Sequence, residues 1–441
     1  MNEENHPIPL KINPKSCVFL GELMSYGTTY SLKILRHLGI FKLKWLSCLL
    51  LLCFCIGYSS CGEDNRKRKT RPSKAERQRQ LRDSLAHFSA LPLKVKHPAD
   101  NPSSPEKIKL GRFLFFDPIL SGNKDVACAT CHHPSNAFAE SLDISIGVNG
   151  QGFGHRRSFQ KPNDIPFTKR NSQTVINTAF NGINFRNRYD PKEAPMFWDV
   201  RAQSLELQAL EPIKSLEEMR GRVYSENEIL EEVVHRLKDI AEYQELFSSA
   251  FEEEDAIEAE NLGKAIACYE RTLLTNNSRF DRYMRGEESA ISLSEKEGFD
   301  QFIQSGCGSC HNGPMFSDFQ EHILGVPENP KLGYSDSGID SSFAFRTPSL
   351  RNLRFTFPYM HNGSLKSLER VLEFYEDIAG GKERNPHVSK NMIDPLAREI
   401  DLRVKEMGPI ISFLNTLNDE SFDKLVPERV PSGLAVGGNI H

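Results

Sequence analysis

The sequence has no excess of charge of one sign, and it has no apolar run long enough to cross a bilayer comfortably. Its 441 residues carry a formal net charge of -4, which gives no reason to expect nucleic acid as a partner. Hydrophobic residues make up 39% of the chain and charged residues 26%, as in ordinary soluble globular proteins. The length is sufficient for two or three domains, each with its own core.

The body of the chain also lacks a disulfide framework. Of the ten cysteines, five lie in the first 61 residues, four lie in two short motifs, and Cys268 stands alone. Cys268 lies next to Ile266 and Tyr269, so we expect it to be a small buried hydrophobic residue. The remaining cysteines direct attention to the two motifs.

Each motif consists of two cysteines three apart, followed at once by histidine. The motifs are Cys128-Ala129-Thr130-Cys131-His132 and Cys307-Gly308-Ser309-Cys310-His311. This spacing is the attachment signature of a c-type haem, in which the cysteines bond to the porphyrin edge and the histidine ligates the iron. The sequence therefore predicts two covalent c-type haems. Redox-active or zinc-binding cysteine pairs are the alternative.

Residues 1–61 are interpreted as a leader. An apolar run at 45–56 follows three basic residues, which is the layout of a secretory signal, and the run is short for a membrane span. It ends in Tyr58-Ser59-Ser60-Cys61, which resembles a bacterial lipobox, so a lipid on Cys61 would anchor the protein. An uncleaved anchor is the alternative. Either interpretation predicts that residue 62 onward lies outside the cytoplasm, where c-type haem is normally attached.

The rest of the chain is expected to hold a tether, two domains and a tail. Residues 62–103 are rich in charge without interleaved aromatic residues, which is typical of a solvated tether. Folded structure is expected to begin at Ser104-Pro105, an N-cap followed by proline. We predict a first domain over 104–285, a second over 286–427, and a disordered tail over 428–441.

Helical patterns dominate both predicted domains. Leu110, Phe113 and Leu114 form an apolar stripe before the first motif and are expected to line a haem pocket. Helices are predicted from Ser294, where Glu297 completes a capping-box spacing, and from Ser367, with a last helix over 410–417. The stretch 141–195 is expected to be loop, and no segment has a convincing strand pattern. The predicted fold class is mainly α, with two cytochrome c-like haem domains and long irregular loops.

With both motifs placed, residues 104–420 resemble the bacterial di-haem cytochrome c peroxidase and MauG superfamily. The resemblance rests on ordered blocks: Leu110-Gly111, Phe115-Phe116-Asp117-Pro118, Arg170-Asn171, Phe197-Trp198-Asp199, Arg346-Thr347-Pro348-Ser349-Leu350-Arg351-Asn352 and Pro358-Tyr359-Met360-His361-Asn362-Gly363. It implies that the first haem meets peroxide and that the second relays electrons.

The resemblance also implies the catalytic residues. A haem that reacts with peroxide needs an open face and an acid-base group above the iron, and the family's distal Gln and Glu correspond to Gln208 and Glu218. Glu218 also has capping-box spacing from Ser215, so a helix cap is the alternative. Trp198 corresponds to the relay between the haems, and a core tryptophan is the alternative.

Val148 departs from the pattern of many di-haem peroxidases, in which a histidine at this position blocks the first haem. Valine cannot ligate iron, so the resemblance to MauG-type members implies an open first haem. His155, in the following glycine-rich loop, is the alternative ligand.

Tyr375 is a second departure, because electron-transferring members have an axial methionine fourteen residues after His361. A phenolate ligand favours ferric and higher oxidation states. The alternative is a core tyrosine, with the ligand being one of three methionines, namely Met360, Met392 or Met407.

The resemblance further implies a calcium ion, bound by the Asn171 side chain and by the carbonyls of Thr356 and Pro358. Oxygen ligands suit this hard cation.

Together these features predict a periplasmic, lipid-anchored di-haem peroxidase. It would reduce hydrogen peroxide to water with electrons from a small cytochrome c or similar donor protein. One alternative is a MauG-type oxidase, which uses high-valent iron to oxidise a partner protein; Val148 and Tyr375 point that way. The other is a non-catalytic di-haem electron carrier. Membrane contact is expected only through the leader or a lipid anchor.

Overall fold

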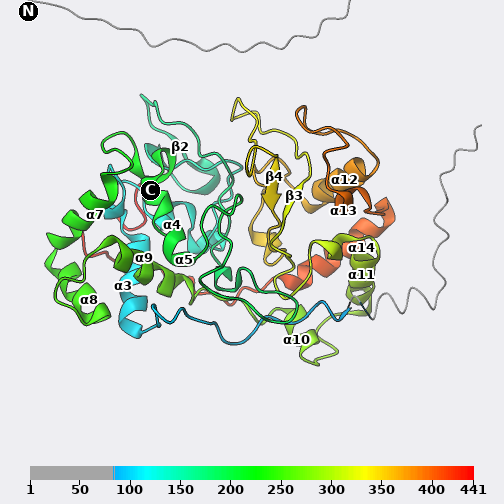
Figure 1. Cartoon of the computed structure of the whole chain (residues 1–441), viewed down its shortest axis with the longest axis horizontal. Helices are drawn as coiled ribbons and strands as arrows, with labels where there is room; N and C mark the ends of the chain where they lie inside the picture. Colours follow the sequence, from blue (N-terminus) through cyan, green and yellow to red (C-terminus); the bar gives the residue numbers. More distant parts are fainter. Residues whose placement is uncertain (1–82, 84) are drawn as a thin grey trace, which may run out of the picture. The chain divides into compact units, whose positions relative to one another are not determined.

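Helices α3 (Pro105–Phe116) and α9 (Ala259–Glu270) pack together at the centre of the N-terminal half (Figure 1). The computed structural model describes residues 83 and 85–441, so the leader with Cys61 lies outside the described residues. As predicted, Ser104 caps α3 by accepting the Lys107 N–H at 3.1 Å. A Cβ on Gly111 would lie 1.9 Å from the Ala265 carbonyl oxygen, so this close helix contact requires glycine.

The same arrangement recurs in the C-terminal half, where α11 (Leu293–Gln304) packs against α14 (Val404–Leu414). A Cβ on Gly298 would lie 2.1 Å from the Pro409 carbonyl oxygen. Ser292 and Glu295 form the capping box of α11, so the predicted start at Ser294 was wrong by two residues. Each haem motif thus follows a helix that is held by a glycine contact.

The other helices range from single turns of four residues to the 12 residues of α12. They are α4 (Cys128–Cys131), α5 (Leu205–Gln208), α6 (Glu211–Lys214), the π-helical turn η5 (Leu216–Arg220), α7 (Ile229–Lys238), α8 (Ala241–Phe251), α10 (Arg279–Met284), α12 (Leu368–Ala379) and α13 (Pro395–Arg398). Ser367 caps α12 as predicted. The last helix begins at Val404, earlier than predicted, although it contains Pro409.

The described residues are largely helical, but two small antiparallel sheets are present. In one, β1 (Gly150–Gln151) pairs with β2 (Ser158–Phe159), and in the other β3 (Glu321–Ile323) pairs with β4 (Ala344–Arg346). The expectation that no strand forms was wrong, because strands this short show no alternating pattern. None of the described helices is long and apolar enough to cross a bilayer.

Separate apolar clusters lie in the two halves. Leu110 and Leu114 are fully buried in the same apolar cluster as Ile266 of α9. Neither they nor Phe113 line the cavity that contains the two motifs, so the expectation that this stripe lines a haem pocket was wrong. Cys268 is fully buried, as predicted. The C-terminal cluster is built on Phe280, Phe299, Phe302, Phe316 and Phe413. The boundary at 285/286 stays a prediction.

Residues 85–101 are not a solvated tether. Phe88 is 5% exposed and packs edge-on against Phe299, with ring centroids 5.1 Å apart. Leu91 is 1% exposed, and its N–H donates to the buried Asp281 carboxylate at 2.9 Å. The prediction failed because single apolar residues within a charged stretch are enough to hold it: Phe88 packs in the C-terminal core and Leu91 in a smaller apolar cluster with Phe180 and Met315.

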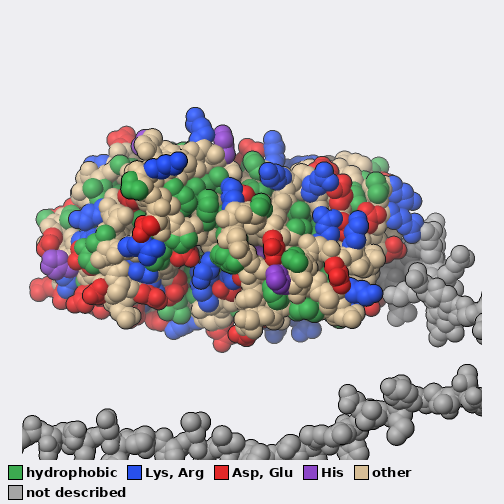
Figure 2. Space-filling model, turned by 90° about the horizontal axis from the view of Figure 1, so that it is seen from above, with side chains coloured by type: hydrophobic (Ala, Val, Ile, Leu, Met, Phe, Trp, Pro, Cys, Tyr) green, Lys and Arg blue, Asp and Glu red, His purple; other side chains and the backbone are tan. Residues whose placement is uncertain are grey.

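The tail over 428–441 is not disordered either. Ser432 Oγ donates to Asp117 at 2.6 Å, and Thr130 Oγ donates to the Gly437 carbonyl at 2.7 Å. The C-terminus therefore returns to α4 and the first motif (Figure 1). On the face shown in Figure 2, basic and acidic side chains are interspersed, as the small net charge suggests.

Candidate functional site

Both haem motifs line one cavity of about 740 Å³. All six motif side chains that the sequence singles out contribute to its wall, namely Cys128, Cys131, His132, Cys307, Cys310 and His311. The four cysteines form no disulfide. The cavity also receives Gln208, Glu218, Trp198, Tyr375, Asn171, Thr356 and Pro358.

The two motif histidines are oriented in the same way. His132 Nδ1 lies 3.1 Å from the Phe138 carbonyl oxygen, and His311 Nδ1 lies 3.0 Å from the Phe316 carbonyl oxygen. A carbonyl can only accept, so Nδ1 carries the proton and the lone pair is on Nε2. Burial lowers the pKa of both imidazoles, which keeps them neutral. Neutral, oriented histidines beside unpaired cysteines fit a covalent haem at each motif.

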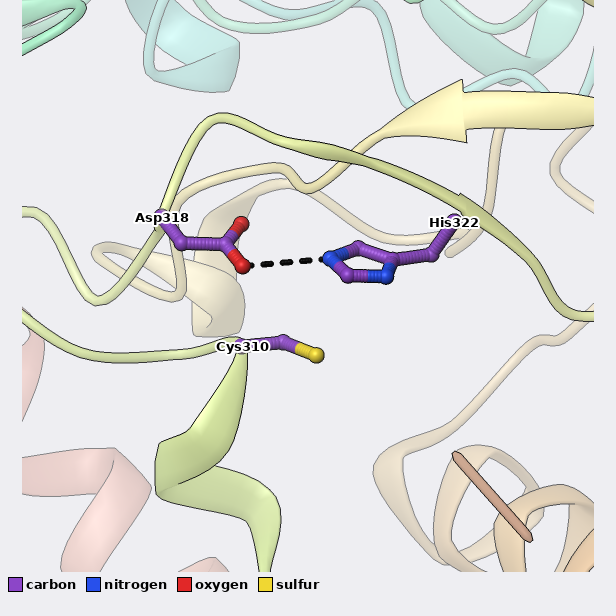
Figure 3. A group of neighbouring side chains, drawn as sticks. All are labelled: Cys310, Asp318 and His322. Carbon is purple, nitrogen blue, oxygen red and sulfur yellow. Dashed lines mark hydrogen bonds and ion pairs between the residues drawn. The ribbon is translucent and has the colours of Figure 1, made fainter. Parts of the chain in front are cut away.

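Cys310, Asp318 and His322 lie together beside the second motif (Figure 3) and superficially form a metal site. His322 Nε2 lies 3.1 Å from Asp318 Oδ2, and its Nδ1 lies 2.9 Å from Asp394 Oδ2. Both ring nitrogens therefore donate. The bonds to Asp318, then Cys310 and Asp394, raise the pKa of His322 to about 11.

A doubly protonated imidazole has no lone pair for a metal, and Cys310 belongs to the haem motif. The His322 side chain is therefore a fixed cation between the carboxylates of Asp318 and Asp394. Cys310, Asp318 and His322 are the only three-residue group of potential metal ligands in residues 83 and 85–441, which leaves little support for a zinc site at either motif. The charge on His322 could not be inferred from the sequence, because its partner Asp394 is distant in the chain.

Glu218 faces the cavity from η5, and Gln208 faces it from the end of α5. Ser215 is the N-cap of η5. Its side chain makes no capping hydrogen bond to the backbone, but it is hydrogen-bonded to the Glu218 side chain, so the helix cap stays an alternative. Burial raises the pKa of Glu218, while Arg201 opposes the shift. The raised pKa suits a group that takes up and releases protons.

Val148 lies outside the cavity, fully buried in the N-terminal core. The preceding residue, Gly147, packs directly on η5: a Cβ there would lie 2.2 Å from the Glu218 carbonyl oxygen. His155 is exposed and does not line the cavity. Neither residue of this loop is placed to ligate a first haem.

Trp198, His361 and Phe345 form an aromatic row on the cavity wall. Trp198 is 9% exposed, and its Nε1 donates to the Asn171 carbonyl at 3.0 Å. Its ring lies edge-on to His361 at 6.4 Å, and His361 stacks on Phe345 at 3.7 Å. Burial lowers the pKa of His361 to about 3, so its ring is neutral. Sequence reasoning included His361 only as part of a motif block.

Arg170 joins this row to both halves of the chain. Its guanidinium pairs with Asp199, next to Trp198, and with Asp336, each at 2.6 Å. It also lies over the Phe345 ring at 5.3 Å. The charged pairs hold the aromatic row in one geometry.

Tyr375 lines the cavity from α12. Burial and then the nearby Cys310 and Cys307 raise its pKa, so the phenol keeps its proton unless a cation binds. Of the alternative methionines, Met360 lines the cavity, whereas Met392 is 40% exposed and Met407 packs in the C-terminal core.

The three residues expected to bind calcium all border the cavity. The Asn171 side-chain nitrogen donates to the Leu142 carbonyl at 2.7 Å. The amide oxygen is thus the atom of Asn171 that remains for a cation, with the carbonyls of Thr356 and Pro358 as possible further ligands.

Comparison with known proteins shows relatives of two kinds. A family model described as di-haem cytochrome c peroxidase matches residues 105–289. The methylamine utilization protein MauG of Methylorubrum extorquens is 37% identical over 342 residues, covering 76% of this chain and 85% of that protein. Cytochrome c551 peroxidase of Pseudomonas aeruginosa is 31% identical over 319 residues, covering 70% and 82%.

A solved structure shares the fold. The crystal structure of a MauG-like protein associated with microbial copper homeostasis matches with a TM-score of 0.60 and 28% sequence identity. The match covers 75% of this chain and 95% of that one.

Proposed function

The chain belongs to the di-haem cytochrome c peroxidase and MauG superfamily, and we propose that it reduces hydrogen peroxide to water with electrons from a small cytochrome c. The overall reaction takes up two protons and two electrons for each peroxide. The observation that carries this proposal is that Glu218 and Gln208 share one cavity with His132. An acid-base group and a hydrogen-bonding amide are what cleavage of the oxygen-oxygen bond requires.

We propose one c-type haem at each motif, within two cytochrome c-like domains over 104–285 and 286–427. His132 and His311 would hold the irons, and the four motif cysteines would form the thioether bonds. Haem supplies iron centres that can bind peroxide and store electrons. We further propose a calcium ion at Asn171, Thr356 and Pro358, a periplasmic location, and a lipid anchor at Cys61.

Glu218 is proposed to move the proton. Its carboxylate takes a proton from one peroxide oxygen and returns it to the other, which leaves as water when the oxygen-oxygen bond breaks. The first oxygen becomes a second water with the two protons and two electrons of the overall reaction. Gln208 holds the peroxide in position by hydrogen bonding. The raised pKa of Glu218 brings proton release closer to neutral pH, where such exchange is efficient.

Trp198 is proposed to relay electrons between the two motifs. Its indole N–H is bonded to the Asn171 carbonyl oxygen, which is too weak a base to remove a proton. Electron transfer through the ring can therefore proceed without proton loss. His361 and Phe345 extend the aromatic contact from Trp198.

A MauG-type oxidase that acts on a partner protein is the second candidate. It is favoured by the placement of Val148 in the core and of Tyr375 in the cavity, because the first haem would be open and the second would carry a phenolate ligand. The 37% identity to a MauG protein supports the same candidate.

The test is steady-state peroxide consumption by the holoprotein with a reduced cytochrome c. We expect turnover to fall at least about a hundredfold in Glu218→Gln. If one equivalent of peroxide changes the spectrum but no cytochrome donor supports turnover, the protein would be an oxidase instead. A fully low-spin protein that does not respond to peroxide would be an electron carrier.

A further inference from the structure

Glu270, the last residue of α9, is a buried carboxyl that none of the roles above uses. It is 3% exposed and lines the cavity that contains the first motif. Its Oε2 atom is buried and has no hydrogen-bond partner. A buried carboxylate without a partner is costly, so this side chain needs an explanation.

The natural counter-ion of Glu270 is the adjacent Arg271, but that guanidinium is already engaged. Arg271 donates two hydrogen bonds to Glu206 of α5, at 2.6 and 3.0 Å. Asn101 donates a third bond to the Glu206 carboxylate, at 2.8 Å. Arg271 therefore donates its two bonds to Glu206 and acts on Glu270 only as a nearby charge, not as a hydrogen-bonded counter-ion.

The surroundings of Glu270 hold it in the neutral form. Burial raises its pKa to about 8; Arg271 lowers it and Glu206 raises it further. Two other titratable groups are within electrostatic range, Tyr269 on the same helix and Cys128 on α4. In the holoprotein Cys128 would be a thioether and would not titrate, so Arg271 and Glu206 remain the main charged neighbours.

Packing places α9 beside the first motif. Ile266 and Tyr269 of α9 belong to the apolar cluster against which Cys128 packs, and the Glu270 carboxyl acts to raise the pKa of the Cys128 thiol. Helix α9 packs against α3, α5 and α7, so the position of Glu270 is rigid.

We propose that Glu270 is a second proton-holding group of the first haem cavity, besides Glu218, and that it releases its proton to cavity water when that haem is oxidised and recovers it on reduction. The proposal rests on a haem at Cys128 and His132, as proposed above, but not on the reaction with peroxide. Added electron charge on the haem is balanced by a proton taken from solvent onto the Glu270 carboxylate. No other reactant is needed.

The experiment is a redox titration of the holoprotein at a series of pH values, with a chemical reductant and no peroxide. An ionised carboxylate favours the more positive ferric haem. The first haem's potential should therefore fall as pH rises through about 8, whereas the second haem serves as an internal reference. In Glu270→Gln the potential of the first haem should no longer fall with pH in this range.

Two further variants separate this role from a structural one. Glu260→Gln, on the same helix but with a side chain that is 69% exposed, should behave like the unmodified protein. Glu206→Gln frees Arg271 to pair with Glu270, so the fall in potential should move to lower pH. Reduced-minus-oxidised infrared spectra should show a protonated carboxyl band that is absent in Glu270→Gln.

An unchanged pH dependence and an unchanged infrared band in Glu270→Gln would overturn the proposal. Loss of peroxide turnover in Glu218→Gln concerns the proposed function alone, because the redox titration contains no peroxide. The two proposals can therefore fail independently.

Discussion

Gly147 and Glu218 are in direct backbone contact. A Cβ on Gly147 would lie 2.2 Å from the Glu218 carbonyl oxygen and 2.4 Å from that of Glu217. The loop that contains Gly147 and Val148 thus packs against η5. The position of the Glu218 carboxyl depends on a residue that never reaches the cavity.

Gly147→Ala should displace η5 and lower peroxide turnover. Misplacement of a catalytic group by about 1 Å can cost about a hundredfold in rate, and we expect a loss of at least about tenfold with unchanged haem content. The measurement is kcat in the donor-coupled assay. Gly408→Ala is the matched control, because no atom lies within 4 Å of a Cβ at that position. Equal rates in both variants would show that the Gly147 contact does not position Glu218.

Tyr375→Met should raise the reduction potential of the second haem, because a thioether stabilises ferrous iron relative to a phenolate. The potential is measured by spectroelectrochemical titration. Met360→Leu is the control, since Met360 is the alternative ligand that also lines the cavity. If the potential shifts in Met360→Leu but not in Tyr375→Met, the ligand is Met360 and not Tyr375.

His322→Gln should lower the potential of the second haem. The substitution removes a cation and leaves Asp318 and Asp394 as unbalanced carboxylates beside the second motif, and negative charge favours ferric iron. In the holoprotein Cys310 would be a thioether, but the hydrogen bonds to Asp318 and Asp394 still raise the pKa of His322, so the cation should persist across neutral pH. A higher potential in the variant would contradict this placement of charge.

Asp281→Asn should destabilise the fold. Asp281 accepts two hydrogen bonds from Arg351, both at 2.9 Å, and both side chains are almost fully buried. Breaking a buried pair typically costs about 3 to 5 kcal/mol, measured as the free energy of unfolding in urea. Glu242→Gln breaks a similar pair with Arg429 at the surface, and should change stability little.

The Asp281 pair also predicts a pH dependence of stability. Burial acts to raise the pKa of Asp281, but Arg351 and the hydrogen bonds hold it below its ordinary value. The stabilisation is therefore complete above the unfolded-state pKa and is lost as pH falls through the folded-state pKa. Asp281→Asn should remove this part of the acid sensitivity, and an unchanged acid profile would contradict the assignment.

The sequence by itself determined the features that depend on neighbours in the chain. The two haem motifs are local spacings, and the helix starts after Ser104 and Ser367 follow from one capping side chain each. Family membership could be inferred because its motif blocks are also local and occur in order.

Tertiary structure decided the features that depend on distant contacts. The packing of Phe88 and of the C-terminal tail, the cation at His322, and the isolation of Glu270 all arise from residues far apart in the chain. Whether a charge is paired or a side chain is buried depends on which groups the fold brings together. Glu270 is the clearest case, because only the fold shows that the adjacent Arg271 is hydrogen-bonded to Glu206 instead.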